Sequence, residues 1–431
     1  MHDPILQKLI KREIQRQRET LDLIPSENIV SPEVLKILGS PLANKYSEGY
    51  PGKRYYSGNE VIDKIEILAQ ERARKVFRLG KNWHVNVQAY SGSPANMAVY
   101  SALLGTQMNA DQINPRGSAQ INPRKSADII GMSLPFGGHL THGWKVNFSG
   151  RIYKSVQYGV GRDGFLDYEA IRKMAKRERP KIIVAGATAY PRILDFKKFG
   201  AIAREVGAYF LADISHVAGL IATEAHPSPF PYADVVTTTT HKTIRGATGA
   251  IIFSKKSEIR NQKSEITIAA AIDKAVFPGL QGGPHDNQTA AIAMALFEAN
   301  TEQFKKYGRQ TIKNAKALAH ELIRLGFNLV SGGTDNHLML IDLANLGISG
   351  REAQDRLESN GIIVNRNTIP YDTRSPFDPS GIRLGTPALT TRGMKEKEMK
   401  EIAQYIYSVL VARKNVSVTI RRLCRRFLLP Y

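Results

Sequence analysis

Short apolar runs alternate with helical stretches between residues 77 and 284, and this alternation limits the fold more than any other feature. The apolar runs lie at 84–88, 129–132, 182–185, 209–212, 235–240 and 250–253, and the helical stretches include 94–104, 168–176 and 196–205. This alternation predicts an α/β fold whose mostly parallel sheet is covered by helices on both faces. Ligands of such a sheet bind beyond the carboxyl ends of its strands.

Two of these strands end at charged side chains. Asp213 closes the run that begins at Tyr209, and Lys242 follows the β-branched run from Val235 to Thr240. A lysine there is poorly solvated, and its neutral amine is a nucleophile toward carbonyls. The pair suits pyridoxal phosphate (PLP), because the amine binds the aldehyde covalently and the carboxylate keeps the ring nitrogen protonated. Taken singly, the lysine also fits a solvated loop residue, and the aspartate fits a helix cap or turn former.

The chain divides into four expected segments. Residues 1–75 form an N-terminal arm, helical to about Glu19 and then rich in loops, and residues 76–286 form a large PLP-binding domain. A helical stretch at 288–325 opens a smaller α+β domain at 287–413, which a basic tail at 414–431 follows. The tail mixes arginines with apolar residues. That pattern allows a membrane-surface helix but favours a frayed terminus or one covered by a partner.

Composition excludes several classes of protein. One cysteine, Cys424, in 431 residues rules out an internal disulfide and a cysteine-based zinc site, and it fits a cytoplasmic location. No apolar run reaches about 18 residues, so no membrane span is expected. The net charge of +21 would suit nucleic acid, but the basic residues are scattered, so a nucleic-acid partner is not expected. The spacing in His139-Leu-Thr-His142 differs from that of metalloproteases, and no metal site is expected.

Three further motifs carry groups that bind anions. Ser91-Gly-Ser-Pro94 opens a helix with Ser93 as its expected N-cap, and it fits either an ordinary helix start or a phosphate cup. The glycine-rich run 277–284 is either a domain linker or a second anion-binding loop. Arg383 lies in an apolar strand, where its guanidinium requires a carboxylate from the protein or from a substrate.

The motifs follow one another in a specific order. Two of them are Thr237-Thr-Thr-Thr-His-Lys-Thr243 and Ser331-Gly-Gly-Thr-Asp-Asn-His337, and the whole series occupies 23–28, 44–56, 91–93, 137–143, 213–216, 237–243, 277–284, 331–337 and 380–387. With this collinear set, the chain resembles serine hydroxymethyltransferase from about residue 5 to residue 411.

The resemblance implies a fold-type I PLP enzyme with a mostly parallel seven-stranded sheet, a homodimer whose two active sites are shared between subunits. It implies reversible transfer of the serine hydroxymethyl group to tetrahydrofolate, giving glycine and 5,10-methylenetetrahydrofolate. Lys242 would carry PLP, Asp213 would pair with its pyridine nitrogen, and His139 would stack on its ring. Glu48 would act as general acid or base at the hydroxymethyl group, with Tyr56 beside it.

The resemblance also assigns the binding residues. His241 belongs to both the catalytic and the cofactor set, and His216 and Thr188 would lie near the ring hydroxyl. The remaining PLP residues would be Ser91, Gly92 and Ser93, with Tyr46 and Gly283 supplied by the partner subunit. Arg383 would bind the substrate carboxylate, and the other residues expected at serine or folate are Ser26, Leu134, Gly138, Asn365, Ser375 and Phe377.

The chain departs from the family pattern at two site positions. Thr188 replaces a serine but keeps a hydroxyl, whereas Thr248 replaces an arginine, a charge that Arg245 either does or does not restore. Residues 112–127 hold a tandem eight-residue repeat, interpreted as a surface loop. Two other hypotheses stay open, a folate-independent PLP aldolase of β-hydroxy amino acids and a degenerate paralogue that binds nucleic acid.

Overall fold

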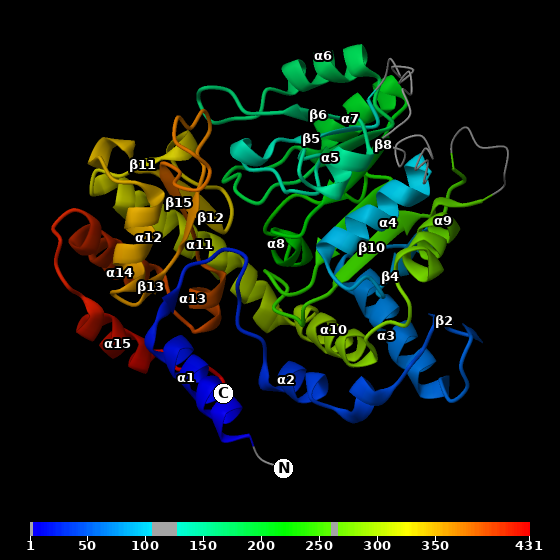
Figure 1. Cartoon of the computed structure of the whole chain (residues 1–431), viewed down its shortest axis with the longest axis horizontal. Helices are drawn as coiled ribbons and strands as arrows, with labels where there is room; N and C mark the ends of the chain where they lie inside the picture. The colour runs from blue at the N-terminus through cyan, green and yellow to red at the C-terminus, as the bar shows by residue number, and fades with distance from the viewer. Residues whose placement is uncertain (1–2, 106–126, 260–265) are drawn as a thin grey trace, which may run out of the picture.

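A seven-stranded sheet forms the centre of the larger part of the molecule (Figure 1). The computed structural model describes residues 3–105, 127–259 and 266–431. The strands, in spatial order, are β4 (Trp83–Asn86), β10 (Ala250–Lys255), β9 (Val235–Thr239), β8 (Tyr209–Asp213), β7 (Ile182–Ala185), β5 (Ile129–Met132) and β6 (Ser155–Tyr158). Only β10 runs antiparallel to its neighbours, which confirms the expected α/β fold.

Both faces of this sheet are buried, because successive side chains along each strand point to opposite sides. Ile183 and Phe210 face one core, and Ile182 and Leu211 face the other. The first core is covered by α3 (Glu60–Val76), α6 (Tyr168–Glu178), α7 (Phe196–Val206), α8 (Ala218–Ala222) and α10 (Asp286–Ala299). The second core lies under α4 (Gly92–Leu104) and α9 (Ile268–Lys274), with α5 (Phe148–Ile152) at its edge.

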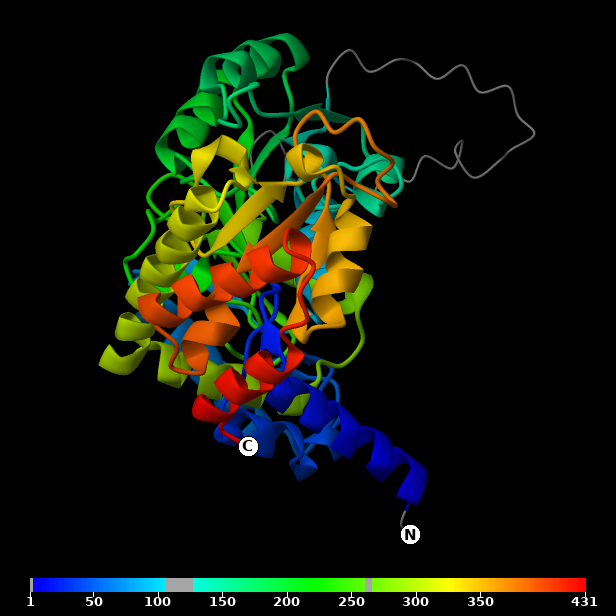
Figure 2. The same cartoon turned by 90° about the vertical axis from the view of Figure 1, so that its left-hand side faces the viewer.

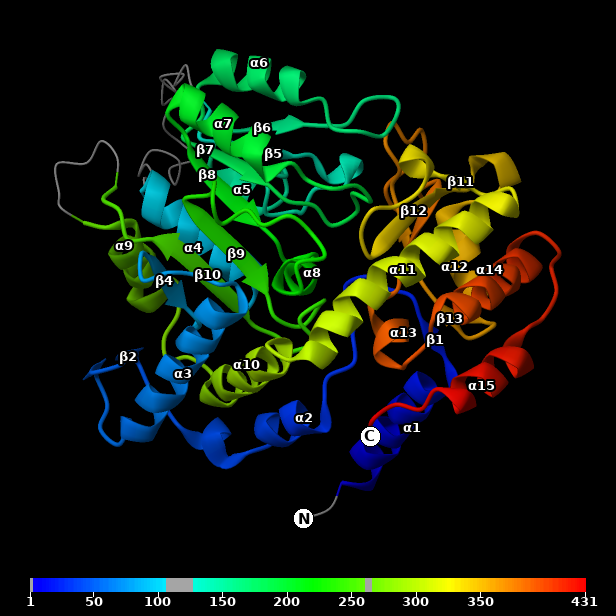
Figure 3. The ribbon, with the colours of Figure 1, turned by 180° about the vertical axis from the view of Figure 1, so that it is seen from behind.

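A third core, the C-terminal core, belongs to the C-terminal part of the chain. Its four-stranded antiparallel sheet has the order β11 (Asn328–Leu329), β12 (Leu338–Asp342), β15 (Gly381–Gly385) and β14 (Asn365–Asn367). The helices around it are α11 (Glu302–Arg324), α12 (Gly350–Glu358), α13 (Pro387–Thr391) and α14 (Glu396–Leu410). In Figure 3 the long helix α11 runs from α10 along this C-terminal core.

The expected helix at 288–325 is in fact two helices, α10 and α11. The break falls at Asn300 and Thr301, where the Thr301 hydroxyl accepts a hydrogen bond from the backbone N–H of Phe304. A side chain that caps a new helix in this way competes with continuation of the preceding one.

The N-terminal arm leaves the body as an exposed helix (Figure 2). Asp3 caps α1 (Pro4–Glu19), and no residue of α1 is buried. The chain then pairs through β1 (Leu21–Asp22) with β13 (Ile362–Ile363) and continues to α2 (Pro32–Leu38), which packs on α10.

The C-terminal tail is an ordered helix packed on the body, which corrects the expectation of a frayed end or a separate surface helix and leaves the expected cover by a partner untested. It forms α15 (Ser417–Arg426), whose Ile420, Leu423 and Cys424 are buried in the C-terminal core. Arg392 donates hydrogen bonds to the carbonyls of Cys424 and Thr20, which joins the tail to the arm. Accordingly, α1 and α15 lie side by side (Figures 1 and 3).

Two sequence expectations concern particular segments. The tandem repeat lies outside the described residues except for Ala127, which is buried. Among the described helices, none combines the length and the apolar composition that crossing a membrane requires.

Candidate active site

A cavity of about 620 Å³ opens where β8 and β9 end. Asp213 is the last residue of β8, and Lys242 follows β9 by one short turn. The predicted residues that line this cavity are Ser26, Ser91, Gly92, Ser93, Leu134, His139, Thr188, Asp213, His216, His241, Lys242 and Arg383. The site therefore forms beyond the carboxyl ends of the strands, where ligand binding was expected.

Lys242 is held as a nucleophile. Its Nζ donates to the Thr239 hydroxyl over 2.9 Å. Burial, opposed by Asp213 and assisted by the nearby Arg383, lowers the pKa of Lys242 to about 8. An amine with this pKa is partly neutral near pH 7, as attack on an aldehyde requires.

Asp213 is kept ionised by a ring of donors that sequence analysis left without roles. Ser215 donates to Oδ1 through its backbone N–H over 3.1 Å and through its hydroxyl over 2.6 Å. Asn96 Nδ2 and His142 Nε2 lie 2.9 and 3.1 Å from Oδ2. Burial by itself would raise the pKa of Asp213, but His142, His139 and Ser215 hold it far below its usual value.

Two ring nitrogens and one carboxylate oxygen lie close enough together to be taken for a metal site. His139, His142 and Asp213 place one ligand atom each within 4.8 Å of one another. The contact between His142 and Asp213 and the contact of His139 Nδ1 with the Thr141 hydroxyl, 2.7 Å, already account for this cluster as hydrogen bonding. It also lies inside the proposed cofactor cavity.

His139 and His241, two imidazoles of the cavity, are neutral. Burial lowers the pKa of His139 to about 4, with a further contribution from His142. Burial and the neighbouring Lys242 lower the pKa of His241 to about 4. An uncharged ring at His139 is suited to stacking on a flat aromatic group. A charged ring would be less suitable, because burying its charge away from water costs free energy.

Arg383 is a buried cation on the wall of the cavity. It lies on β15 and donates to the Thr188 carbonyl over 2.5 Å and to Asn365 Oδ1 over 3.2 Å. Burial lowers its pKa to about 10. No carboxylate within the described residues lies in ion-pair range of it. A buried guanidinium without a protein counter-ion matches an anionic ligand.

The helix α4 begins earlier than expected. Ser91 is its N-cap and Gly92 its first residue, whereas Ser93 and Pro94 had been expected at these two positions. Pro94 is tolerated because first-turn N–H groups have no partner within the helix. Ser91, Gly92 and Ser93 line the cavity at the positive end of the helix, where unpaired first-turn N–H groups are suited to an anion.

Four predicted residues gather at a different place. Glu48 Oε1 accepts from the Tyr46 hydroxyl over 3.2 Å, and the rings of Tyr46 and Tyr56 lie 5.2 Å apart. A Cβ on Gly283 would lie 3.6 Å from Glu48 Cγ. None of these residues lines the cavity around Lys242, so the chain does not bring its own Glu48 to its own Lys242.

The expected folate residues are also divided. Leu134 lines the cavity, and the Gly138 carbonyl accepts from the Thr188 hydroxyl over 3.1 Å. A side chain at Gly138 would collide with the Met132 carbonyl, only 1.9 Å from the Cβ position. Ser375 and Phe377 lie on an exposed loop, with Phe377 78% exposed.

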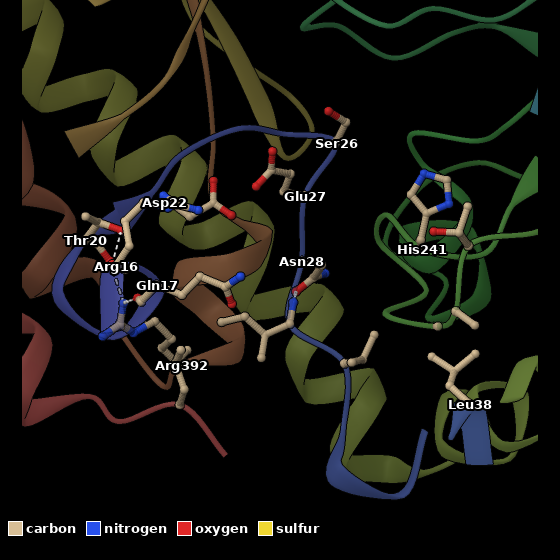
Figure 4. A pocket seen from close by; sticks show the side chains of 16 residues that line it. Arg16, Gln17, Thr20, Asp22, Ser26, Glu27, Asn28, Leu38, His241 and Arg392 are labelled. Atoms are coloured by element: carbon tan, nitrogen blue, oxygen red, sulfur yellow. Dashed lines mark hydrogen bonds between the residues drawn. The ribbon is translucent and has the colours of Figure 1, made fainter. Parts of the chain in front are cut away.

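A second cavity of about 310 Å³ adjoins the first through Ser26, Glu27 and His241 (Figure 4). Thr248 also lines it. Arg245 does not restore the charge that an arginine at 248 would supply, because its guanidinium lies 4.8 Å from the centre of the Tyr307 ring on α11.

Comparisons with known proteins agree on one family. The family model described as serine hydroxymethyltransferase matches residues 1–406. A serine hydroxymethyltransferase of Desulfotalea psychrophila is 52% identical over 434 aligned residues, which cover 99% of this chain and 95% of the relative. A serine hydroxymethyltransferase of Acidothermus cellulolyticus is 52% identical over 411 residues, which cover 95% of this chain and 89% of the relative.

Proposed function

Because the chain belongs to the serine hydroxymethyltransferase family, we propose that the cavity around Lys242 is its active site. The enzyme is a PLP-dependent transferase that passes the hydroxymethyl group of serine to tetrahydrofolate and produces glycine and 5,10-methylenetetrahydrofolate. The observation that carries the site assignment is the cavity itself. Lys242, Asp213, His139 and Arg383 all line it at the strand ends.

The residues present fit PLP. When bound, PLP supplies an aldehyde for Lys242 and a protonated ring that withdraws electrons from the substrate. Asp213, ionised and buried, holds the proton on the ring nitrogen, and His139 provides a neutral ring face. Ser91, Gly92 and Ser93 at the start of α4, together with His241, bind the phosphate.

Substrate orientation comes from Arg383. Its planar fork binds the serine carboxylate, while Thr188 and Asn365 fix the plane of the guanidinium. Ser26 lines the same cavity and completes the polar wall near the carboxylate. Fixing one end of the amino acid in this way limits the directions in which its side chain can point, which is a positioning effect on the bond to be broken.

The acid–base group comes from a second copy of the chain. Glu48, Tyr56, Tyr46 and Gly283 form one cluster away from the chain's own cavity, so a homodimer places this cluster over the cavity of the partner. The exposed apolar residues on α1 give a homodimer a surface to cover. Glu48 then moves the proton at the hydroxymethyl oxygen, with Tyr56 beside it.

Folate enters on the open side of the cavity. Leu134 and the tightly packed Gly138 form a rigid wall there, and the exposed loop with Ser375 and Phe377 offers an apolar side chain to a flat ring. A location in the cytoplasm, the compartment that the single reduced cysteine favours, belongs to the same proposal.

The cofactor assignment is tested by reduction with borohydride followed by peptide mapping. We expect the coenzyme on the peptide that contains Lys242, and no labelled peptide in Lys242→Ala. Serine cleavage measured with and without tetrahydrofolate then tests the transfer itself. Label on another lysine would overturn the assignment.

Shared sites are tested with hybrid dimers of Lys242→Ala and Glu48→Gln chains. If Glu48 acts on the partner, each hybrid has one intact site, and an equal mixture recovers about a quarter of the wild-type activity, because half the dimers are hybrids. If each chain used its own Glu48, no hybrid site would be intact and the mixture would stay inactive.

A further inference from the structure

A second histidine stands behind His216, and the proposed function gives it no role. His337, from the 331–337 motif, places its Nε2 3.3 Å from Nδ1 of His216, with the ring centres 5.5 Å apart. His337 is fully buried and His216 is 4% exposed. His216 lines the cofactor cavity, whereas His337 lies on the far side of it.

A small cavity lies beyond these two rings. It offers about 10 Å³ to the centre of a water molecule, and His216, His226, His337 and Asn336 are among its lining residues. Two buried nitrogens on this cavity, Nδ1 of His337 and Nε2 of His226, have no hydrogen-bond partner within the described residues. Unpaired buried nitrogens and room for one molecule are the conditions under which a water is bound inside a protein.

All three rings are neutral, so each carries a single N–H. Burial and the charges of Lys242 and Arg383 keep the pKa of His216 well below its usual value. Burial and Arg383 lower the pKa of His337 to about 3, and burial lowers the pKa of His226. For a neutral imidazole, the partner of one nitrogen decides whether the other nitrogen is a donor or an acceptor.

The first fixed point is His226. Its Nδ1 lies 2.9 Å from the Pro227 carbonyl, which can only accept, so Nδ1 carries the proton and Nε2 is an acceptor. A water next to this ring therefore donates one of its hydrogens to His226 Nε2. Its second hydrogen needs another acceptor, and the amide of Asn336 is already engaged with Leu338 N and the Tyr190 carbonyl.

We propose that one buried water donates to both His226 Nε2 and His337 Nδ1, and that His337 thereby fixes the tautomer of His216. With Nδ1 accepting, His337 has its proton on Nε2 and donates it to His216 Nδ1. His216 then carries its own proton on Nε2. The opposite assignment would leave the second water hydrogen only the Asp213 carboxylate on this cavity, which already accepts from Ser215, Asn96 and His142. It would also place a bare nitrogen of His216 on the cofactor cavity.

The consequence is a neutral N–H donor with one orientation in the active site. Such a donor stabilises negative charge on the ring oxygen of the cofactor without adding a positive charge beside Lys242 and Arg383. His337 is thus a positioning residue that acts through His216. This inference rests on the cofactor cavity of the proposed function.

The wild-type holoenzyme itself gives the first test. Nitrogen-15 spectra of protein labelled in histidine distinguish protonated from bare ring nitrogens, and His216→Asn identifies the His216 signals. We expect the proton of His216 on Nε2 and that of His226 on Nδ1. Finding the His216 proton on Nδ1 while the cofactor is bound would overturn the inference and leave the proposed function standing.

Two variants of similar size separate a positioning role from a packing role. His337→Gln places an amide N–H near the former Nε2 and can still donate to His216, whereas His337→Asn reaches only the position of Nδ1. We expect the wild-type tautomer and cofactor absorption spectrum in His337→Gln, and a mixed tautomer with a shifted spectrum in His337→Asn.

Identical spectra for the two variants would contradict this role of His337. Borohydride labelling of Lys242 serves as the control, since it reports cofactor binding without passing through His216. Absence of label in the wild type would count against the proposed function, whereas label with the wrong tautomer counts only against the inference.

Discussion

Replacing Arg54 with methionine tests how the loop that carries the acid–base cluster is held. The guanidinium donates to the carbonyls of Ser47 over 2.8 Å and Gly49 over 2.7 Å. It also pairs with Asp63 over 2.8 Å and with Glu66 over 2.6 Å. One buried side chain thus joins the loop to α3 by four hydrogen bonds, and methionine keeps its volume while removing all of them.

The cost follows from the burial of the pair. The Arg54 and Glu66 side chains are only 4% and 2% exposed. Removing one member of a buried ion pair costs about 3–5 kcal/mol, because the remaining charge is left unpaired in the interior. Gln88 still donates to Glu66 over 3.0 Å, so we expect the lower half of this range. Adding Glu66→Leu should recover part of the loss, since an apolar pair of similar volume is often neutral.

The loss should grow as the pH rises. Burial already raises the pKa of Glu66 although Arg54 opposes the shift, so without Arg54 this pKa rises further. At pH values above about 4.3, Glu66 therefore keeps its proton in the folded variant, whereas in the unfolded chain it has released the proton. Folding stability therefore falls with pH across this window, by at most about 1.4 kcal/mol per pH unit.

Urea unfolding followed by circular dichroism, at one chain concentration and at pH 5.5 and 8, measures both effects. Arg172→Met is the matched control, because Arg172 binds Glu205 at 2.6 Å, but these side chains are 42% and 31% exposed. An exposed ion pair of this kind contributes little to stability, because solvent screens it. The reasoning is refuted if Arg54→Met costs no more than this control, or if its cost is the same at both pH values.

Three further predictions concern the cavities. Arg383→Lys keeps a charge but loses the planar fork, so the KM for serine should rise about 10- to 100-fold. Steady-state kinetics measures this change, and an unchanged cofactor spectrum is the control. Asn96→Ala removes a donor to Asp213, so the dissociation constant of PLP in a fluorescence titration should rise about tenfold, and an unchanged constant would contradict that role. Burial and Glu27 raise the pKa of Asp22 to about 7, which lowers stability as the pH rises from about 4 to 7. Glu27→Gln should therefore stabilise the protein against urea more at pH 8 than at pH 5, and the reverse order would refute this.

The sheet was predictable because its strands are buried on both faces. Strands of this kind appear as short continuous apolar runs, and the six expected runs are β4, β5, β7, β8, β9 and β10. β6 was not predicted, because it is an edge strand whose first three residues, Ser155 to Gln157, are only half-buried. No continuous apolar run marks such a strand, and only its pairing with β5 defines it.

The site was predictable as a set of residues but not as a network. His142 and Ser215 stand inside recognised motifs and Asn96 lies two residues beyond one, yet a polar residue in or near a motif does not reveal which group it will contact. Their contacts to Asp213 arise from α4, from the loop after β5 and from the end of β8, which only the fold brings together. The pKa of Asp213 is therefore a property of tertiary structure.

Position 248, which departs from the family pattern, is a second case in which the sequence alone could not decide what a side chain contacts. The sequence identified the lost charge at Thr248 and left Arg245 as a candidate to restore it. The structure places the Arg245 guanidinium over the rings of Phe304 and Tyr307, so its charge is used in packing the loop against α11. Thr248 instead lines a cavity that Glu27 also lines. A charge lost at one position is restored only by a side chain that can reach the same space, and the backbone directions that decide this are fixed by the fold.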